Sequence, residues 1–432
     1  MSLLACFNSL NDLIKSREKA PTIWVAYSGG LDSTVLLHLA KQWAKENGSL
    51  FSFEPTIKAI HIHHGLSANA DDWLKHAEQQ CQQLNIELVT EKVLLQDVGD
   101  GIELTARKAR YWEFEKHLAE NDILLQGHHL DDQAETFFMR ALRGSGLKGL
   151  SAIPAQRSLS QHHSATILRP LLKANKQDLE DYAQQQGLSW VEDESNDDIQ
   201  YERNWWRNEL LPKIWQRYGV GKKKSLDRSI ENLTADRALL EYFLDQLLAP
   251  EEGSELPNFL QGFTSFSLQV LETLPQQFHS AIIRHWLAQQ GVEASKAQLD
   301  SIVRDMIHCD QGADPDIQLC SYRLRRYRGY LFLIADGELE RLSRPKLKEL
   351  SEFDGYHIRY WQEGDLVKPF GRPTKKLKKY WQDYGIPSWL RSSWPLLVDE
   401  DDVVVAVPGL FNCECVGYGA PLLIEWMPSA KF

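Results

Sequence analysis

An apolar segment followed directly by a glycine-rich turn and a helix-forming segment limits what the N-terminal half of this chain can fold into. TIWVAY occupies 22–27, SGGLDS follows at 28–33, and TVLLHLAKQWA comes next. A strand, a tight turn and a helix in this order present backbone N–H groups and the positive end of the helix dipole to an anion. The two glycines permit the turn, and the serines add hydroxyl donors. The pattern predicts a phosphate-binding loop made of Ser28, Gly29, Gly30, Leu31, Asp32 and Ser33.

Two common nucleotide-binding motifs are absent from this loop. It lacks the lysine of G-x-x-x-x-G-K-[ST], and it lacks the G-x-G-x-x-G pattern of dinucleotide-binding folds. These absences weaken ordinary NTPase and dehydrogenase interpretations. Asp32 is the unusual residue, because phosphates repel a carboxylate unless a divalent cation lies between them. We therefore expect Asp32 to bind Mg²⁺.

The first half of the chain alternates strand-like and helix-like segments. Short apolar runs occupy 22–27, 57–64, 87–93 and 122–127, and helical spacing of apolar residues occupies 70–84 and 103–118. This alternation predicts an α/β fold with a doubly wound parallel sheet. Such sheets bind ligands at the carboxyl ends of their strands, so the turns after Tyr27, His64 and Gly127 are the expected sites.

The turn after Gly127 carries a second group of polar residues, GHHLDDQAET at 127–136. Asp131 and Glu135 are four residues apart and share one face of the expected helix, with Asp132 beside them. Acids in a first turn are also favoured by the helix dipole and by capping, which is the structural alternative. Because this turn and the phosphate loop both follow strands, we favour a site for a polar substrate or Mg²⁺ that includes Asp131, Asp132 and Glu135.

Two further groups offer binding residues, each with a structural alternative. Arg107 and Arg110 share a helix face with Glu103, and they could hold phosphates or transition-state charge, or form a surface pair with that acid. His63 and His64 end the second strand-like run. They could border a pocket for a base or cap the strand.

The chain's 432 residues suffice for about three domains. A composition break near GVGKKKS and the pattern changes after it predict a catalytic domain at 1–217, a mainly helical domain at 218–340 and a small β-rich domain at 350–432. No run approaches the length of a membrane helix, and the N-terminus lacks a basic segment before its apolar part. A cytoplasmic location without membrane attachment is expected, and the oligomeric state stays open.

The net charge of −12 argues at first against a nucleic-acid partner. It is unevenly distributed, because residues 1–320 carry −14 and the remainder carries +2, with a window of +6 at 366–382. Arginines alternate with tyrosines at 322–330, a mixture that suits phosphates and unpaired bases. Charged strand edges that prevent aggregation are the alternative. The RNA interpretation assigns phosphate contacts to Arg325, Arg326, Lys375, Lys376, Lys378 and Lys379.

Four motifs together resemble those of a known family. SGGLDS resembles the signature of the PP-loop ATP pyrophosphatases, which cleave ATP between its α- and β-phosphates to adenylate a substrate. GIELTARKARY, GHHLDDQAET and RNWWRN before LLP narrow the resemblance to the tRNA(Ile)-lysidine synthetase family. The likeness is close over about the first 217 residues and plausible beyond them.

This resemblance implies a ligase that uses ATP. The enzyme would adenylate the C2 oxygen of cytidine 34 in a tRNA(Ile) with a CAU anticodon, and the ε-amine of free lysine would then displace AMP to give lysidine and pyrophosphate. Asp32 and Arg110 would act on the phosphates, His63, His64 and Arg107 would help bind ATP, and Asp131, Asp132 and Glu135 would receive the lysine amine. Arg203 and Arg207 join the expected tRNA contacts.

Two other functions remain open at this point. Another PP-loop enzyme could adenylate a different tRNA base or a small amide-forming substrate. A non-catalytic nucleotide-sensing RNA-binding protein is the second alternative, although the carboxylates at 32, 131, 132 and 135 speak against it.

Overall fold

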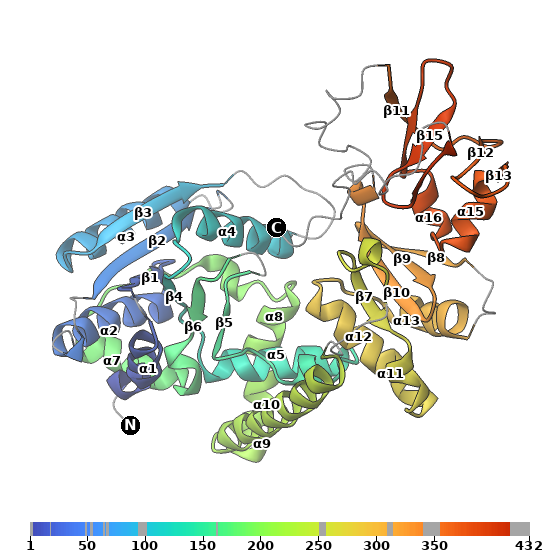
Figure 1. Cartoon of the computed structure of the whole chain (residues 1–432). Coiled ribbons are helices and arrows are strands. Elements are labelled where there is room, and N and C mark those ends of the chain that lie inside the picture. The colour runs from blue at the N-terminus through green and yellow to red at the C-terminus, as the bar shows by residue number, and fades with distance from the viewer. Residues whose placement is uncertain are drawn as a thin grey trace. The chain divides into compact units, whose positions relative to one another are not determined.

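The computed structural model describes residues 3–17, 19–47, 50–51, 55–63, 65, 69–93, 102–160, 163–249, 256–308, 314–339 and 355–414. The chain divides into two compact units, Met1–Leu240 and Glu241–Phe432. Each unit is described by itself below, and Figure 1 shows the elements of both.

The first unit is built on a six-stranded sheet in the order β3-β2-β1-β4-β6-β5. All neighbouring strands run parallel except β5, which is antiparallel to β6. In the register of the central strands, Val25 lies between Ala59 and Leu125. The strand bounds are β1 Thr22–Ala26, β2 Thr56–His63, β3 Glu87–Lys92, β4 Ile123–Leu125, β5 Gln156–Ser158 and β6 Thr166–Leu168.

Helices cover both faces of this sheet, as the alternating strand residues require (Figure 1). Ile23 and Val25 point to the face covered by α1, α2, α3 and α7, whereas Trp24 points to the face covered by α4. The doubly wound α/β fold predicted from the sequence is confirmed. The bounds of these helices are α1 Asn8–Lys15, α2 Leu31–Asn47, α3 Ala70–Gln83, α4 Ile102–His117 and α7 Lys176–Gln185.

Apart from η1, which precedes β1, the remaining helices of the first unit follow β4 in the sequence. Phe138 of α5 stacks on Trp206 of η5, with ring centres 5.7 Å apart, and this contact fixes η5 against α5. The bounds are η1 Leu3–Phe7, α5 Leu130–Leu142, α6 Leu147–Leu150, η3 Pro170–Lys173, η4 Glu194–Asp197, α8 Glu202–Trp205, the π-helical η5 Trp206–Leu210, α9 Leu211–Tyr218 and α10 Lys222–Leu247.

The second unit begins with helices packed on a four-stranded antiparallel sheet in the order β7-β10-β9-β8. The mainly helical region predicted here therefore also contains a sheet, whose strand β9 carries the arginine and tyrosine run. The bounds are η6 Asn258–Leu260, β7 Thr264–Ser267, α11 Gln269–Glu272, η7 Gln276–Phe278, α12 His279–Gln289, α13 Lys296–Ile302, η8 Val303–Ile307, β8 Asp316–Leu319, β9 Tyr322–Tyr327 and β10 Tyr330–Ala335.

A second antiparallel sheet, β11-β14-β15-β16, and the pair β12-β13 form the β-rich C-terminal part of this unit. Its core is continuous with the preceding sheet, because Phe332 and Ile334 of β10 pack in one cluster with Trp381 and Trp389. The bounds are β11 His357–Tyr360, β12 Leu366–Val367, β13 Lys375–Lys376, α15 Leu377–Asp383, α16 Ser388–Arg391, β14 Pro395–Val398, β15 Val404–Val407 and β16 Phe411–Asn412.

None of the described helices combines the length and the hydropathy needed to cross a bilayer.

Candidate active site

The predicted phosphate loop joins β1 to α2 and is closed by its own hydroxyl groups. The Ser33 hydroxyl donates to the Gly30 carbonyl at 3.0 Å and accepts from the Ser28 amide at 3.2 Å. The first hydrogen bond of the α2 ladder runs from the Thr34 amide to the Gly30 carbonyl, so the amides of residues 31–33 have no acceptor within the helix and are available to an anion. Gly29 adopts φ +87°, a conformation that favours glycine.

The turn after β4 packs directly on this loop. Strand β1 pairs with β2 on one side and β4 on the other, so the chain reverses its winding direction between β1 and β4. Open α/β sheets bind ligands at such a point. A β-carbon at Gly127 would lie 3.1 Å from the carbonyl carbon of Asp32. Two of the three turns selected from the sequence, those after Tyr27 and Gly127, therefore meet.

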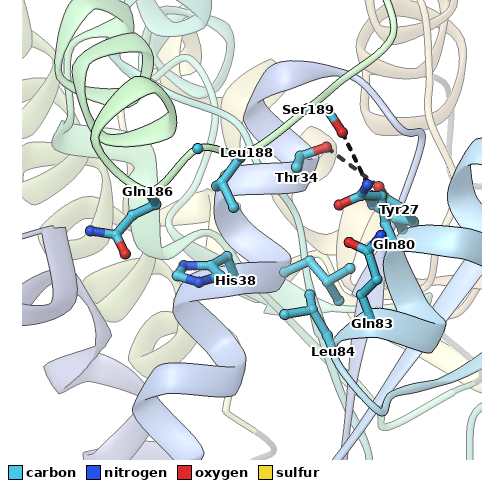
Figure 2. Close-up of a pocket in the computed structure, with 11 residues that line it drawn as sticks. Tyr27, Thr34, His38, Gln80, Gln83, Leu84, Gln186, Leu188 and Ser189 are labelled. Carbon is cyan, nitrogen blue, oxygen red and sulfur yellow. Dashed lines mark hydrogen bonds between the residues drawn. The ribbon is translucent and has the colours of Figure 1, made fainter.

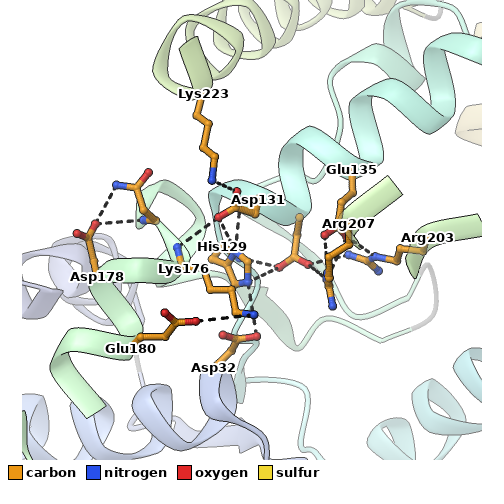
Figure 3. Close-up of polar contacts among 12 residues, drawn as sticks. Asp32, His129, Asp131, Glu135, Lys176, Asp178, Glu180, Arg203, Arg207 and Lys223 are labelled. Atoms are coloured by element: carbon orange, nitrogen blue, oxygen red, sulfur yellow. Dashed lines mark hydrogen bonds and ion pairs between the residues drawn. The ribbon is translucent and has the colours of Figure 1, made fainter. Parts of the chain in front are cut away.

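His129 links the two turns (Figure 3). It is 2% exposed, and its Nε2 lies 3.5 Å from Oδ2 of Asp32 and 3.7 Å from Oδ2 of Asp132. Its Nδ1 accepts a hydrogen bond from the Asp131 amide at 3.2 Å, so the ring proton belongs on Nε2 and points toward the carboxylates. Burial lowers the pKa of His129, but Asp132, Asp32 and Asp131 outweigh burial and raise the pKa above its ordinary value.

Asp132 and Glu135 are bound by two arginines from the helices that follow much later in the sequence (Figure 3). Arg203 donates to Glu135 at 2.7 Å and to Asp132 at 2.8 Å, and Arg207 donates to the same carboxylates at 2.7 and 3.1 Å. Glu135 is 1% exposed and Asp132 is 6% exposed. Burial alone would raise the pKa of Asp132, yet His129 and the arginines hold it well below its usual range. The four side chains form one ion cluster in which the carboxylates are buried and the guanidinium groups are partly exposed.

Asp131 has different partners from its neighbours. Its Oδ1 accepts a hydrogen bond from the ammonium group of Lys223, at the start of α10, and its Oδ2 accepts one from the Lys176 amide at 3.3 Å. The Lys223 ammonium also lies 5.9 Å from the centre of the Trp215 ring. A carboxylate and an aromatic face together suit an ammonium group. Asp131 therefore belongs to an ammonium-binding arrangement.

The environment of Asp32 fits a divalent cation. Its Oδ1 is shielded from solvent and has no hydrogen-bond partner among the described residues. A carboxylate oxygen in this position, beside a loop built for phosphates, is the kind of hard ligand that Mg²⁺ prefers. The donor set therefore fits the cation expected from the sequence, and the metal role of Asp32 stays a proposal.

The structure adds a network that the sequence did not reveal. Arg169, directly after β6, is 3% exposed and donates to Nδ1 of His128 at 3.3 Å and to Oε1 of Gln126 at 2.8 Å. Burial, together with Arg169, Arg203 and Arg107, outweighs Asp132 and lowers the pKa of His128 to about 3. His128 is thus a neutral imidazole whose proton lies on Nε2. Arg169 follows the three-residue strand Thr166–Leu168, which is too short to be recognised as a strand from its sequence.

The other predicted ligand residues of this unit lie outside the phosphate loop and outside the carboxylate-bearing turn after β4. Arg107 is exposed on α4, with its guanidinium 5.1 Å from the centre of the Tyr111 ring, and Arg110 is exposed on the same helix. His63 ends β2 with Nε2 3.3 Å from Oδ1 of Asp71, and among the described residues it forms no hydrogen bond or ion pair with the phosphate loop. His64 and the Glu103 side chain lie outside the described residues. The predicted roles of these residues stay predictions.

Some of the residues predicted to contact RNA in the second unit pair with carboxylates, and others do not. Arg325 pairs with Asp316 of β8 at 2.8 Å, and Arg326 lies on the same strand. Lys375, Lys376, Lys378 and Lys379 are all exposed, and none pairs with a carboxylate in the described part of the chain. Lys368, in the same basic window, pairs with Glu414. The four lysines, together with exposed Arg372, which lies 5.6 Å from the centre of the Tyr384 ring, are therefore the charges of the +6 window that pair with no carboxylate within the described residues.

A cavity of about 200 Å³ lies between α2, α3 and the segment after α7 (Figure 2). Thr34, His38 and Gln80 line it, and His38 shares a 2.9 Å hydrogen bond with Tyr182. It is smaller than ordinary ligand pockets and shares no lining residue with the carboxylates above. We place the chemistry at the strand ends, where the titratable groups converge.

Three family matches cover most of the chain. Residues 4–214 match the PP-loop domain, residues 266–332 match the TilS substrate binding domain, and residues 356–418 match the TilS substrate C-terminal domain.

Curated relatives are similar over nearly their whole length. A tRNA(Ile)-lysidine synthase of Haemophilus influenzae strain 86-028NP is 36% identical, over 93% of this chain and 98% of the relative. Proteins of the same name from Serratia proteamaculans (36% identity, 90% and 91% coverage) and Shigella flexneri (35%, 92% and 93%) are also similar. Among solved structures, the U34-tRNA thiolase NcsA from Methanococcus maripaludis has a TM-score of 0.41 at 18% identity, over 53% of this chain and 78% of that one.

Proposed function

The chain belongs to the tRNA(Ile)-lysidine synthase family of PP-loop enzymes, and on that premise we propose that it ligates free lysine to cytidine 34 of a tRNA(Ile) with a CAU anticodon. It is an ATP-using ligase, and tRNA(Ile) is its substrate. The observation that carries the proposal is the meeting of the phosphate loop and the carboxylate-bearing turn at one point of the sheet.

The proposed reaction has two steps. The C2 carbonyl of cytidine is a poor electrophile, so its oxygen first attacks the α-phosphorus of ATP and pyrophosphate leaves. The lysine ε-amine then attacks C2, and AMP departs with the oxygen. The nitrogen loses its protons to a base in the site or to water. Lysidine, AMP and pyrophosphate are the products.

We assign the phosphate chemistry to the loop at 28–33. The serine hydroxyls and the first-turn amides of α2 would bind the departing pyrophosphate. Asp32 would hold Mg²⁺, which neutralises phosphate charge when bound. Arg110 is proposed to stabilise developing phosphate charge. The proton on Nε2 of His129 would keep Asp32 oriented toward the loop.

Lysine binding is assigned to the carboxylates of the second turn. Asp131 already accepts the ammonium of Lys223, whose place an incoming lysine amine would take, and this supports a role for Asp131 in holding that amine. Asp132 and Glu135 are each bound by two guanidinium groups, so an incoming amine would have to share or replace those partners. We therefore propose that Asp131 binds the amine. Arg203 and Arg207 would keep Asp132 and Glu135 ionised, and the two arginines could also contact RNA.

RNA recognition far from the anticodon is assigned to the second unit. The run at 322–330 lies within the match to the substrate binding domain, and the exposed lysines lie within the match to the C-terminal domain. We propose that both contact tRNA phosphates, in domains at 218–340 and 350–432 that follow a catalytic domain at 1–217. We also propose that the protein is located in the cytoplasm.

One assay tests this function and its rival. Purified protein is incubated with ATP, Mg²⁺ and tRNA(Ile) with and without lysine, pyrophosphate is measured, and the anticodon nucleosides are analysed by mass spectrometry. A mass gain at cytidine 34 only with lysine supports the proposal. Pyrophosphate release with no tRNA present would instead favour a small-molecule substrate, and modification of another base would overturn the assignment of cytidine 34.

A further inference from the structure

Three arginines from different segments of the first unit gather around Tyr111 and Gln126, and a fourth, Arg140, lies near the C-terminal end of α5. Arg107 comes from α4, Arg140 from α5, Arg157 from β5, and Arg169 follows β6. The guanidinium groups of Arg107 and Arg157 lie 5.1 and 4.9 Å from the centre of the same Tyr111 ring. Arg169 acts electrostatically on that tyrosine, and Arg107 on Arg140. We call these four residues the arginine cluster.

The partners of the arginine cluster are neutral. Arg169 donates to the Pro154 carbonyl at 2.7 Å as well as to Gln126 and His128. Arg140 donates to the carbonyls of Ala152 and Gly149, and Arg157 donates to those of Ser158 and Leu159. Within the described residues, no carboxylate forms an ion pair with any of the four. Arg203 and Arg207, by contrast, each contact two carboxylates.

This arrangement leaves positive charge uncompensated in a partly buried place. Burial, assisted by Arg157 and Arg107, lowers the pKa of Arg169 to about 10 despite the opposing effect of Tyr111. Burial and Arg107 also lower the pKa of Arg140. Cations with only neutral partners in a low-dielectric environment are stabilised when an anion binds between them. Arginine is also the side chain whose geometry best suits a phosphate group.

We propose that the arginine cluster binds a backbone phosphodiester of the RNA substrate next to the nucleotide that is modified. The inference rests on the proposed function and identifies the group of the tRNA that the first unit holds. A phosphate fixed there would orient the neighbouring base toward the reacting atoms without reading its sequence.

The position of the cluster favours RNA over the phosphates of ATP. The loop at 28–33 follows β1, whereas Arg169 follows β6, with β4 between them. Two strand spacings separate these points, roughly 10 Å. His129 contacts Asp32 on one side of the β4 turn, and His128 contacts Arg169 on the other. The cluster also extends from buried Arg169 to exposed Arg107. This arrangement suits an RNA strand that passes from the protein surface into the site.

Direct binding measurements test the inference without requiring turnover. Arg157→Gln and Arg107→Gln are made singly and together, because their side chains support less of the fold than Arg169 does. Affinity for tRNA(Ile) is measured at several salt concentrations without ATP or lysine, and ATP affinity is measured by calorimetry without tRNA. Arg304→Gln is the matched control, because this exposed arginine has its own carboxylate partner in Asp305.

Each variant should weaken tRNA binding about tenfold and reduce the slope of log affinity against log salt by about 0.7–0.9. Arg157→Lys should restore part of the affinity, and in Arg157→Gln the affinity for ATP and the KM for lysine should stay unchanged. Unchanged tRNA affinity and salt slope would overturn the inference, whether or not ATP or lysine binding weakened. If the wild type bound tRNA but formed no lysidine, the proposed function would fail while the salt slopes still decided this inference.

Discussion

Gly127 and Asp32 are in backbone contact: a β-carbon on Gly127 would lie 3.1 Å from both the carbonyl carbon and the carbonyl oxygen of Asp32. The two turns that bear the candidate catalytic residues therefore meet so closely that a methyl group would fit only if the backbone shifted by a few tenths of an ångström. The neighbour is the backbone at the start of α2, which cannot rotate away as a flexible side chain would.

Gly127→Ala should push the β4 turn away from the phosphate loop and reduce pyrophosphate release by about tenfold or more, because small displacements of reacting groups strongly reduce rates. Thermal stability should fall only slightly. Gly146→Ala is the control, since a β-carbon there would meet no atom within 4 Å. Equal activities of the two variants would show that the contact is not needed for catalysis.

Asp32→Asn keeps the shape of the side chain and removes its charge. Pyrophosphate release should fall by about 100-fold or more, and titration with Mg²⁺ should no longer change the rate, because an amide is a poor ligand for this cation. Binding of tRNA should be retained. Asp12→Asn removes the same charge from an exposed position on α1 and should have no effect. An unchanged Mg²⁺ dependence in Asp32→Asn would place the metal elsewhere.

Glu135→Gln tests the ion cluster as a stabilising element. The substitution leaves Arg203 and Arg207 with a single shared carboxylate, Asp132, and should cost about 2 kcal/mol of unfolding free energy after allowance for the partial exposure of the arginines. Glu209→Gln, which breaks a surface pair with Lys213, should cost less than about 0.5 kcal/mol. Urea unfolding followed by circular dichroism makes the comparison. Similar small losses for both variants would mean that the buried cluster adds no stability.

The pKa of His128 predicts a dependence of stability on pH. Its folded value of about 3 lies below the ordinary value near 6.5, so the stability it contributes is complete above about pH 6.5 and is lost as pH falls toward 3. At pH 5 the loss should approach about 2 kcal/mol. His128→Asn keeps an acceptor for Arg169 and removes this titration, so its stability should change less between pH 8 and 5.

His129 also titrates, and its effect must be separated from that of His128 when the pH profiles of the wild type and His128→Asn are compared. Its pKa is raised, so its contribution increases as pH falls, opposite in sign to that of His128. Because both proteins retain His129, its effect cancels when the two pH profiles are subtracted. Identical profiles for the wild type and His128→Asn would contradict the assignment of a neutral, hard-to-protonate His128.

The phosphate loop and the β4 turn were predictable because each depends on residues that are close together in the sequence. A strand, two glycines and a helix determine the loop over a dozen residues, and parallel strands bring their carboxyl ends to one edge. The partners of the carboxylates were not predictable in this way. Arg203 is 68 positions from Glu135, and no periodicity relates residues so far apart. The sequence identifies the motif that contains Arg203 and Arg207, but it does not predict the ion pairs of these arginines with the β4 turn.

The arginine cluster was missed for a different physical reason. Strand β6 has three residues, too few to show the alternation or the apolar run that marks a strand. Its carboxyl end therefore was not among the turns expected to carry ligands, although Arg169 lies there. A short buried strand and the residue after it become visible only when the pairing of β6 with β4 is known.

The exposed lysines of the second unit supply the last prediction. Changing Lys375, Lys376, Lys378 and Lys379 together to Gln should weaken tRNA binding by at least about tenfold and lower the salt slope by up to about 3, since each lysine at a phosphate releases one counterion. Four lysines that pair with carboxylates provide the matched control: Lys58, Lys75, Lys116 and Lys213. Changing those four to Gln removes the same total charge but should leave the salt slope nearly constant. If both quadruple variants lowered the slope equally, net charge rather than this basic surface would explain RNA binding.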